Sequence, residues 1–156
     1  MAVNRTPFAP IVPTRNAKSF RAGDYRRRVL VVDDESVIAD SIAKILTMSD
    51  YAAIAAYDAE SALETALLSP PELLITDVLL PGMSGIDLAI TIKRIYPDCR
   101  ILLFSGQAST ADLLGAARRE GHHFTLLSKP LPPREMLAVV ALQLGPFGIK
   151  IPEMAA

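Results

Sequence analysis

The sequence predicts an α/β fold in which a parallel sheet is covered by helices on both faces. Two observations support this. Five short apolar runs of strand length recur along the chain, and each is followed by a segment whose apolar residues recur at helical spacing. Strands that alternate with helices of about ten residues form a parallel sheet through right-handed crossovers. For five strands, the leading topology is the flavodoxin-like, doubly wound order 2-1-3-4-5.

The composition is that of a globular protein from a reducing compartment. The chain has 156 residues, 51% of them hydrophobic, and a net charge of −1, which excludes a disordered chain and indicates one domain. Cys99 is the only cysteine, so no internal disulfide can form. No apolar stretch reaches the roughly 18 residues of a membrane span, and the N-terminus lacks a secretory apolar core. We therefore expect a cytoplasmic protein.

Charge divides the chain into two parts. Residues 1–28 contain seven Lys or Arg and one Asp, a net charge of +6, whereas residues 29–156 contain nine basic and sixteen acidic residues, a net charge of −7. We expect a basic, proline-containing, mobile arm at 1–27, a domain at 28–145 and a short tail at 146–156. The arm lacks interleaved aromatic residues, so a solvated tail is favoured over binding to nucleic acid.

The first two strand–helix units show clear boundaries. Val29–Val32 is a β-branched run of the kind buried on both sheet faces, and it ends in three acidic residues. Ser36 is predicted to cap the helix that follows. An alanine-rich second strand, Tyr51–Tyr57, leads to a helix capped by Asp58 and stopped by the prolines at 70 and 71. The predicted inner faces are Ile38, Ile42, Ile45 and Leu46 in the first helix, and Ala62, Leu63, Ala66 and Leu67 in the second.

Three more units follow with the same alternation. The strands are predicted at Leu73–Thr76, Ile101–Phe104 and Phe124–Leu127, and the helices at Ile86–Ile95, at 109–119 and from Pro132-Pro133 to Gly145. The predicted inner-face residues of these helices are Leu88, Ala89, Ile92 and Ile95, then Leu113, Leu114 and Ala117, and finally Met136, Val140 and Leu144.

Polar residues follow four of the strands at their carboxyl ends. Asp33 and Asp34 follow the first strand, Asp77 the third, Ser105 the fourth and Lys129 the fifth. The predicted strand order brings these ends to one edge, where ligands bind in open α/β sheets. Three crowded carboxylates repel one another unless a cation intervenes, and an oxygen-only ligand set suits Mg²⁺.

This residue set fits aspartyl-phosphate chemistry. Asp77 would attack phosphorus, Mg²⁺ and Lys129 would offset the charge on the phosphoryl oxygens, and Ser105 Oγ would donate a hydrogen bond to another of those oxygens. Each element alone is a weak signal, because an Asp pair after a strand is often only a helix-capping turn. The convergence of four strand ends makes the combination specific.

Four segments closely resemble the receiver domain of two-component response regulators: residues 31–35 (VVDDE), residues 77–85 (DVLLPGMSG), Ser105-Gly106 and Lys129-Pro130. The resemblance covers residues 28 to about 144. It implies that Asp77 is the phospho-acceptor, which takes its phosphoryl group from a phosphohistidine on a sensor histidine kinase or a histidine phosphotransfer protein. It also implies that Asp34, Asp77 and the backbone carbonyl of Leu79 bind Mg²⁺ directly, and that Asp33 acts through water.

The resemblance also implies how the signal leaves the site. Ser105 would be the switch hydroxyl that moves towards the phosphoryl group, Lys129 would contact that group, and the Lys129-Pro130 bond would be cis. We therefore expect a stand-alone, single-domain response regulator that catalyses only its own phosphorylation and dephosphorylation. In this family the fourth helix, fifth strand and fifth helix are the usual output face, for an unidentified downstream protein or a homodimer.

Two departures from the family pattern affect the expected output. Receivers usually carry Tyr or Phe three residues before the lysine, where this chain has Leu126. Phe124 lies on the same strand face, but core packing is its expected role. The segment 121–123 is also about one residue longer than usual. Leu79 and Gln107 should flank the path of the attacking water.

Two other functions compete with this interpretation. A degenerate receiver could act as a protein-interaction scaffold without phosphorylation; the complete set of site residues disfavours it, and the missing aromatic residue favours it. A phosphatase of the haloacid dehalogenase type also uses an Asp nucleophile. That class needs a second acid two residues after the nucleophile, and Leu79 occupies this position.

Overall fold

The computed structural model describes residues 25–106 and 110–145, which alternate between strands and helices throughout. Most of the basic arm, Gln107 and the tail at 146–156 lie outside these residues. None of the helices in the described ranges is long and apolar enough to cross a bilayer. The elements are β1 (Arg28–Val32), α1 (Ser36–Met48), β2 (Ala52–Ala56), α2 (Ala59–Leu68), β3 (Leu73–Asp77), α3 (Gly85–Ile95), β4 (Arg100–Ser105), α4 (Thr110–Arg119), β5 (Thr125–Ser128) and α5 (Pro133–Leu144).

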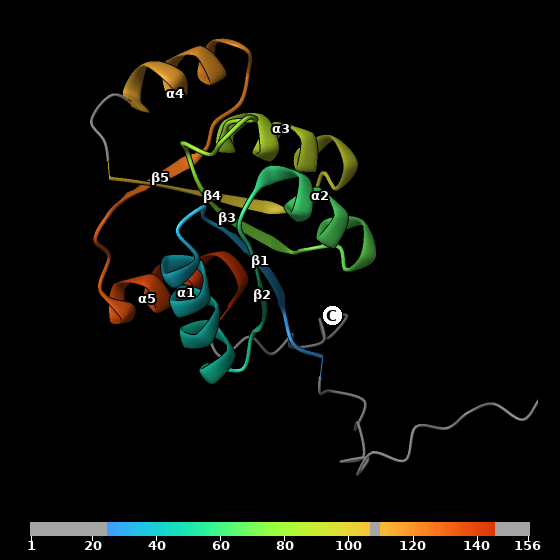
Figure 1. Cartoon of the computed structure of the whole chain (residues 1–156), viewed down its shortest axis with the longest axis vertical. Coiled ribbons are helices and arrows are strands. Elements are labelled where there is room, and N and C mark those ends of the chain that lie inside the picture. Colours follow the sequence, from blue (N-terminus) through green and yellow to red (C-terminus); the bar gives the residue numbers. More distant parts are fainter. Residues whose placement is uncertain (1–24, 107–109, 146–156) are drawn as a thin grey trace, which may run out of the picture.

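The five strands form one parallel sheet in the order β2-β1-β3-β4-β5, which confirms the predicted topology (Figure 1). The register aligns the carboxyl ends of the central strands. Val32 lies opposite Thr76, and Ser105 lies opposite Ser128. The residues that follow β1, β3, β4 and β5 therefore meet at one edge of the sheet.

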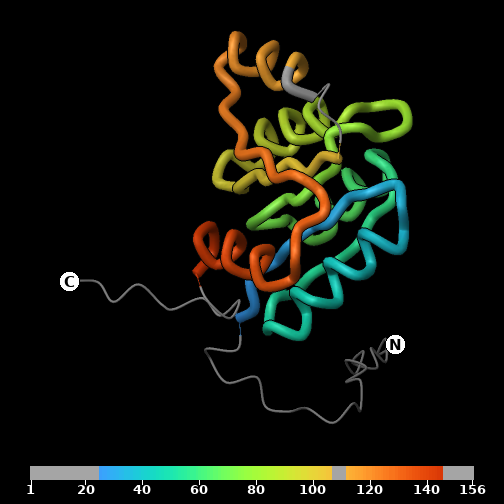
Figure 2. The backbone as a smooth tube through the Cα atoms, turned by 90° about the vertical axis from the view of Figure 1, so that its left-hand side faces the viewer, coloured from blue at the N-terminus to red at the C-terminus, as the bar shows by residue number. Residues whose placement is uncertain are grey.

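Two apolar cores fill the space between the sheet and its helices. Alternate residues of β1 point to opposite faces, so Val29 and Val31 belong to one core and Leu30 and Val32 to the other. The first core lies under α1 and α5, which Figure 2 shows side by side, and the second lies under α2, α3 and α4. A strand buried on both faces needs a continuous apolar run, which explains the composition of β1.

The helices bury most of the predicted inner-face residues, but three predictions were wrong. Leu67, Ile95 and Leu113 were predicted to point inward, and they are 63%, 44% and 41% exposed. In α2 the small side chains of Ala59, Ala62 and Ala66 form the contact, and Leu67 lies outside this narrow stripe. Ile95 is the last residue of α3, and in α4 the buried side chains are those of Leu114 and Ala117.

Side-chain caps begin two of the helices, and the predicted cap of α1 is wrong. Asp58 accepts a hydrogen bond from the Ser61 N–H at 2.7 Å, as predicted, and this bond lowers the pKa of the carboxyl group. In α1 the N-cap position belongs to Glu35, whose side chain makes no capping bond, and Ser36 is already helical. Instead, Asp33 Oδ1 accepts a hydrogen bond from the Glu35 N–H at 3.0 Å.

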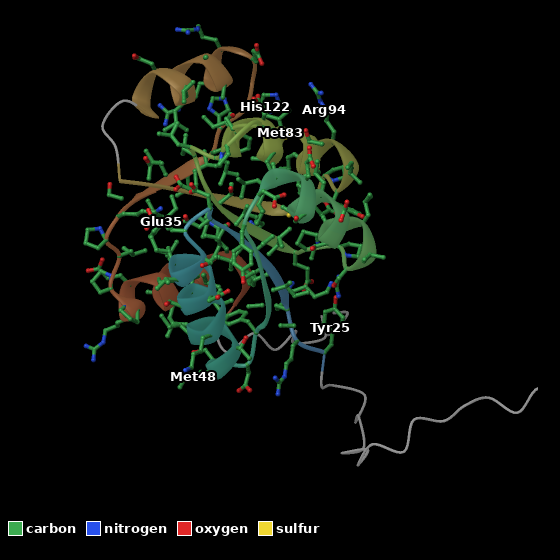
Figure 3. The ribbon with its side chains drawn as sticks, viewed as in Figure 1. Tyr25, Glu35, Met48, Met83, Arg94 and His122 are labelled. Atoms are coloured by element: carbon green, nitrogen blue, oxygen red, sulfur yellow. The ribbon has the colours of Figure 1, made fainter. Side chains whose placement is uncertain are left out.

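Both ends of the described chain lie at the edge of the sheet opposite the acidic residues. Figure 3 shows Tyr25 beside the start of β1, far from Glu35 at the start of α1. At the end of α5, Gly145 C=O accepts a hydrogen bond from the hydroxyl of Tyr51, the residue before β2, at 2.7 Å. The loops at the carboxyl ends of the strands thus lie away from Tyr25 and Gly145, where the described chain begins and ends.

Candidate functional site

Three carboxylates cluster at the carboxyl ends of β1 and β3. Asp33, Asp34 and Asp77 each contribute one oxygen to a group whose members lie within 4.8 Å of one another. Asp33 is 2% exposed, Asp77 is half-buried and Asp34 is open to solvent. The cluster thus has a buried side formed by Asp33 and an open side formed by Asp34, through which a ligand can enter.

Lys129 supplies the positive charge that this cluster requires. Its Nζ lies 2.7 Å from Asp33 Oδ2 and 2.9 Å from Asp77 Oδ2. Burial by itself would lower the pKa of the ammonium group, but the hydrogen bonds and charges of the two carboxylates outweigh that effect and raise it above its ordinary value. Lys129 is therefore a cation throughout the neutral pH range.

Ser105 and Lys129 are joined through the ends of β4 and β5. Ser105 is the last residue of β4 and is buried, with 6% of its surface exposed. Its carbonyl oxygen accepts a hydrogen bond from the Lys129 N–H at 2.9 Å. The Lys129–Pro130 peptide bond is cis, as the family resemblance implied. A backbone hydrogen bond thus connects the two residues across the ends of β4 and β5.

The loop after β3 holds the Asp77 carboxylate from the side opposite Lys129. The Leu79 N–H donates a hydrogen bond to Asp77 Oδ1 at 3.2 Å, while Oδ2 pairs with Lys129. The Leu79 side chain is 38% exposed and offers no polar group. Each carboxylate oxygen of Asp77 thus has a defined donor, which fixes the orientation of the carboxylate plane.

The start of α3 packs directly against the backbone of Asp77, a feature that the sequence analysis missed. A β-carbon at Gly85 would lie 1.7 Å from the Asp77 carbonyl oxygen and 3.1 Å from Thr76 Oγ1. The Thr76 hydroxyl donates to the same carbonyl at 3.0 Å, and the Gly85 N–H donates to Val78 C=O at 2.8 Å. Only glycine fits this contact. The signal in the sequence was a glycine at the first position of an apolar helix, directly after a turn.

The donor set fits Mg²⁺. All three side chains of the cluster offer carboxylate oxygens, and no nitrogen or sulfur ligand joins them among the described residues. Mg²⁺ prefers oxygen ligands, keeps several waters and binds through one or two carboxylates. The exposed Asp34 and the half-buried Asp77 provide such ligands on the open side of the cluster.

The side chains of β5 are largely exposed, and this strand is part of the predicted output face. Leu126 lies opposite Leu103 in the sheet, so it faces the α3–α4 side, and it is 37% exposed. Phe124 packs against the core on that side, and its ring stacks on His122 at a centroid distance of 5.9 Å. The aromatic residue of this segment therefore packs against the core, and the aliphatic Leu126 occupies the position three residues before Lys129.

An apolar groove opens beside Lys129, between α1 and the start of α5. Its volume is about 270 Å³. Val37, Ile38 and Ile42 line it from α1, and Leu131 and Met136 line it from the other side. Val37 is 76% exposed, and it lies three residues after Asp34. The groove therefore presents apolar surface next to the open side of the carboxylate cluster.

Comparisons with known proteins cover most of the chain. The sequence profile of the response regulator receiver domain matches residues 29–141. The regulatory protein VanR of Enterococcus faecium is 33% identical over 119 residues, which cover 75% of this chain and 49% of VanR. The chain thus spans about half the length of this curated relative.

Solved structures with the same fold include receiver domains from several organisms. The receiver domain of an HD domain-containing protein from Pseudomonas fluorescens Pf-5 has a TM-score of 0.70 and 30% identity, over 77% of this chain and 88% of that one. A CheY-like receiver domain protein from Methanospirillum hungatei has a TM-score of 0.68 and 26% identity, over 75% and 92% of the two chains.

Substitution of Gly85 by alanine should destabilise the protein and displace Asp77. The added carbon cannot coexist with the Asp77 carbonyl, so we expect a loss of about 1–3 kcal/mol or more in the free energy of unfolding, measured by denaturant titration. Gly115→Ala is the matched control. Space is open around Gly115 in α4, so this change should stabilise the helix by up to about 1 kcal/mol. Equal stability of Gly85→Ala and the parent protein would contradict the close packing.

Proposed function

Because this chain belongs to the response regulator receiver domain family, we propose that it accepts a phosphoryl group on Asp77 and thereby changes its binding to a partner protein. The donor is a phosphohistidine on a sensor histidine kinase or a histidine phosphotransfer protein. One observation carries the proposal: the Lys129 ammonium group bridges Asp33 and Asp77 inside a cluster of three carboxylates.

In the proposed reaction an Asp77 oxygen attacks the phosphorus atom in line with the phosphorus–nitrogen bond of the donor. The new oxygen–phosphorus bond forms as the phosphorus–nitrogen bond breaks, and the electron pair of the broken bond stays on the nitrogen. The donor ring leaves as neutral imidazole, because its other nitrogen carries a proton. Lys129 Nζ, which lies 2.9 Å from Asp77 Oδ2, then donates a hydrogen bond to a phosphoryl oxygen.

A Mg²⁺ ion supplies positive charge that offsets the charge on the phosphoryl oxygens when it is bound. Asp34, Asp77 and the backbone carbonyl of Leu79 would hold it directly, and Asp33 would act through water. Asp33 is 2% exposed, whereas Asp34 is open to solvent, which supports an indirect role for Asp33.

The proposed switch is the Ser105 hydroxyl, which donates a hydrogen bond to a second phosphoryl oxygen. The backbone bond between Ser105 and Lys129 supports this role, because it couples the two groups that contact the phosphoryl group. Their shared movement would reach the surface at β5, where Leu126 is partly exposed. In this chain an aliphatic side chain, not an aromatic ring, would transmit the change.

The groove beside Lys129 is the proposed docking surface for the phosphohistidine donor. It is apolar, and it opens next to the site, so a helix of the donor could pack in it while its histidine reaches Asp77. Docking at this groove is separate from the chemistry at Asp77, and the two can be tested independently.

Asp77→Asn should abolish phosphorylation. We expect wild-type protein to gain the mass of one phosphoryl group when it is mixed with Mg²⁺ and acetyl phosphate, because the carboxylate is the nucleophile, and Asp77→Asn to gain none. Intact mass spectrometry measures both. A folded wild-type protein that gains no mass with any phosphodonor would contradict the proposal and favour a phosphorylation-independent scaffold.

Lys129→Ala should keep the fold but lose the response to phosphorylation. Without the ammonium group, Asp33 and Asp77 repel each other, so the variant should unfold at lower denaturant concentration, and added Mg²⁺ should recover much of the loss. Lys44→Ala removes an exposed lysine from α1, and it should change neither the stability of the protein nor its response to phosphorylation. A phosphorylation-dependent change in the NMR spectrum of Lys129→Ala that matched wild type would remove Lys129 from the mechanism.

Val37→Glu should slow the transfer of the phosphoryl group from a protein donor, and it should leave transfer from a small-molecule donor unchanged. The charged side chain places a carboxylate in the apolar groove, so we expect a loss of at least about tenfold in the rate of transfer from a phosphorylated histidine phosphotransfer domain. Because Val37 is exposed and belongs to the groove and not to the carboxylate cluster, labelling by acetyl phosphate should stay within about twofold. Equal losses with both donors would show that Val37 acts on the chemistry and not on docking.

A further inference from the structure

β2 is an edge strand of the sheet, and two of its five residues point their backbone groups away from β1. The Ala52 N–H donates to Arg27 C=O at 2.8 Å, and the Asp33 N–H donates to Ala56 C=O at 3.2 Å. Backbone groups alternate in direction along a strand, so Ala52, Ile54 and Ala56 face β1. The N–H and C=O groups of Ala53 and Ala55 therefore face the open edge.

This edge lacks the features that usually prevent strands from pairing between molecules. Natural edge strands carry charged residues, prolines or bulges. Residues 52–56 are Ala-Ala-Ile-Ala-Ala, with no charge, no proline and no glycine, and all five positions pair in regular register with β1. The small alanine side chains leave the backbone accessible to a second strand.

The sequence around β2 is palindromic. Residues 50–58 read Asp-Tyr-Ala-Ala-Ile-Ala-Ala-Tyr-Asp, which is the same in both directions, with Ile54 at the centre. An antiparallel pair of β2 strands about a two-fold axis through Ile54 places Ala52 opposite Ala56, Ala53 opposite Ala55, and the two copies of Ile54 opposite each other. In a two-fold interface residue i contacts residue j and residue j contacts residue i, so this register sets small side chains against small ones.

The directions of the backbone groups in β2 are compatible with a two-fold axis through Ile54. Ile54 points its backbone groups at β1, so the two copies of Ile54 form a non-hydrogen-bonded pair, the type in which opposed side chains lie closest. On each side of the axis, Ala53 of one copy lies opposite Ala55 of the other, and these residues carry the outward groups. We propose that two copies of this chain associate by antiparallel pairing of β2 about Ile54, which joins their sheets into one. This association does not depend on phosphorylation.

The surroundings of the edge favour a second copy. Ile54 is 44% exposed, Met48 at the end of α1 is 77% exposed and Leu68 at the end of α2 is 88% exposed, and both helices contact β2. The pairing is confined to β2, because Asp50, with a φ of 67°, lies in the turn before the strand, and Asp58 caps α2.

Two variants of opposite charge at Ile54 test the proposed two-fold axis directly. We expect wild-type protein to dimerise in sedimentation equilibrium, and Ile54→Lys and Ile54→Glu each to weaken dimerisation at least about tenfold, because each variant opposes its own charge. A mixture of the two variants should recover association, since unlike charges then meet at the axis. Leu142→Lys, which alters a leucine on α5 that is 85% exposed, should leave dimerisation unchanged.

Amide hydrogen exchange on the wild-type protein tests the pairing without any substitution. The amides of Ala53 and Ala55 should gain protection as protein concentration rises, while those of Ala52 and Ile54, which face β1, should be protected at every concentration. A monomer at millimolar concentration would overturn the proposal. So would a dimer that Leu142→Lys disrupts and the Ile54 variants do not, because that result would assign association to the α5 face.

Discussion

The ion pairs of Lys129 with Asp33 and Asp77 are the interaction on which the rest of the site depends. Three carboxylates within 4.8 Å of one another would repel, and the ammonium group makes their clustering possible. Lys129 follows β5, the short edge strand with the least cover, and its partners lie at the ends of β1 and β3. The same pairs that balance the charge therefore also tie an edge strand to the centre of the sheet.

Most of the fold could be predicted from the sequence because it depends on periodicity. Each observed strand boundary lies within one residue of its prediction, since apolar runs such as Val29–Val32 have clear ends. The clustering of Asp33, Asp77 and Lys129 followed from strand order alone. Details that depend on atomic contacts could not be predicted: the approach of Gly85 to the Asp77 carbonyl, and the exposure of Leu67 and Leu113, whose helices pack through smaller or neighbouring residues.

A backbone hydrogen bond connects the carboxylate cluster to β2, the edge strand. The Asp33 N–H donates to Ala56 C=O, so the residue that anchors the carboxylate cluster is also bonded to the last residue of the edge strand. Asp33 Oδ1 also accepts a hydrogen bond from the Glu35 N–H at the start of α1. Asp33 is therefore bonded both to the end of β2 and to the start of α1, the helix that lines the groove.

Both ends of the described chain lie far from the carboxylate cluster, at Tyr25 and Gly145 (Figure 3). Tyr25 and Gly145 are therefore attachment points at the end of the sheet opposite the loops around Asp77. A short tag joined directly to either residue would start away from the surface that a phosphate donor must reach.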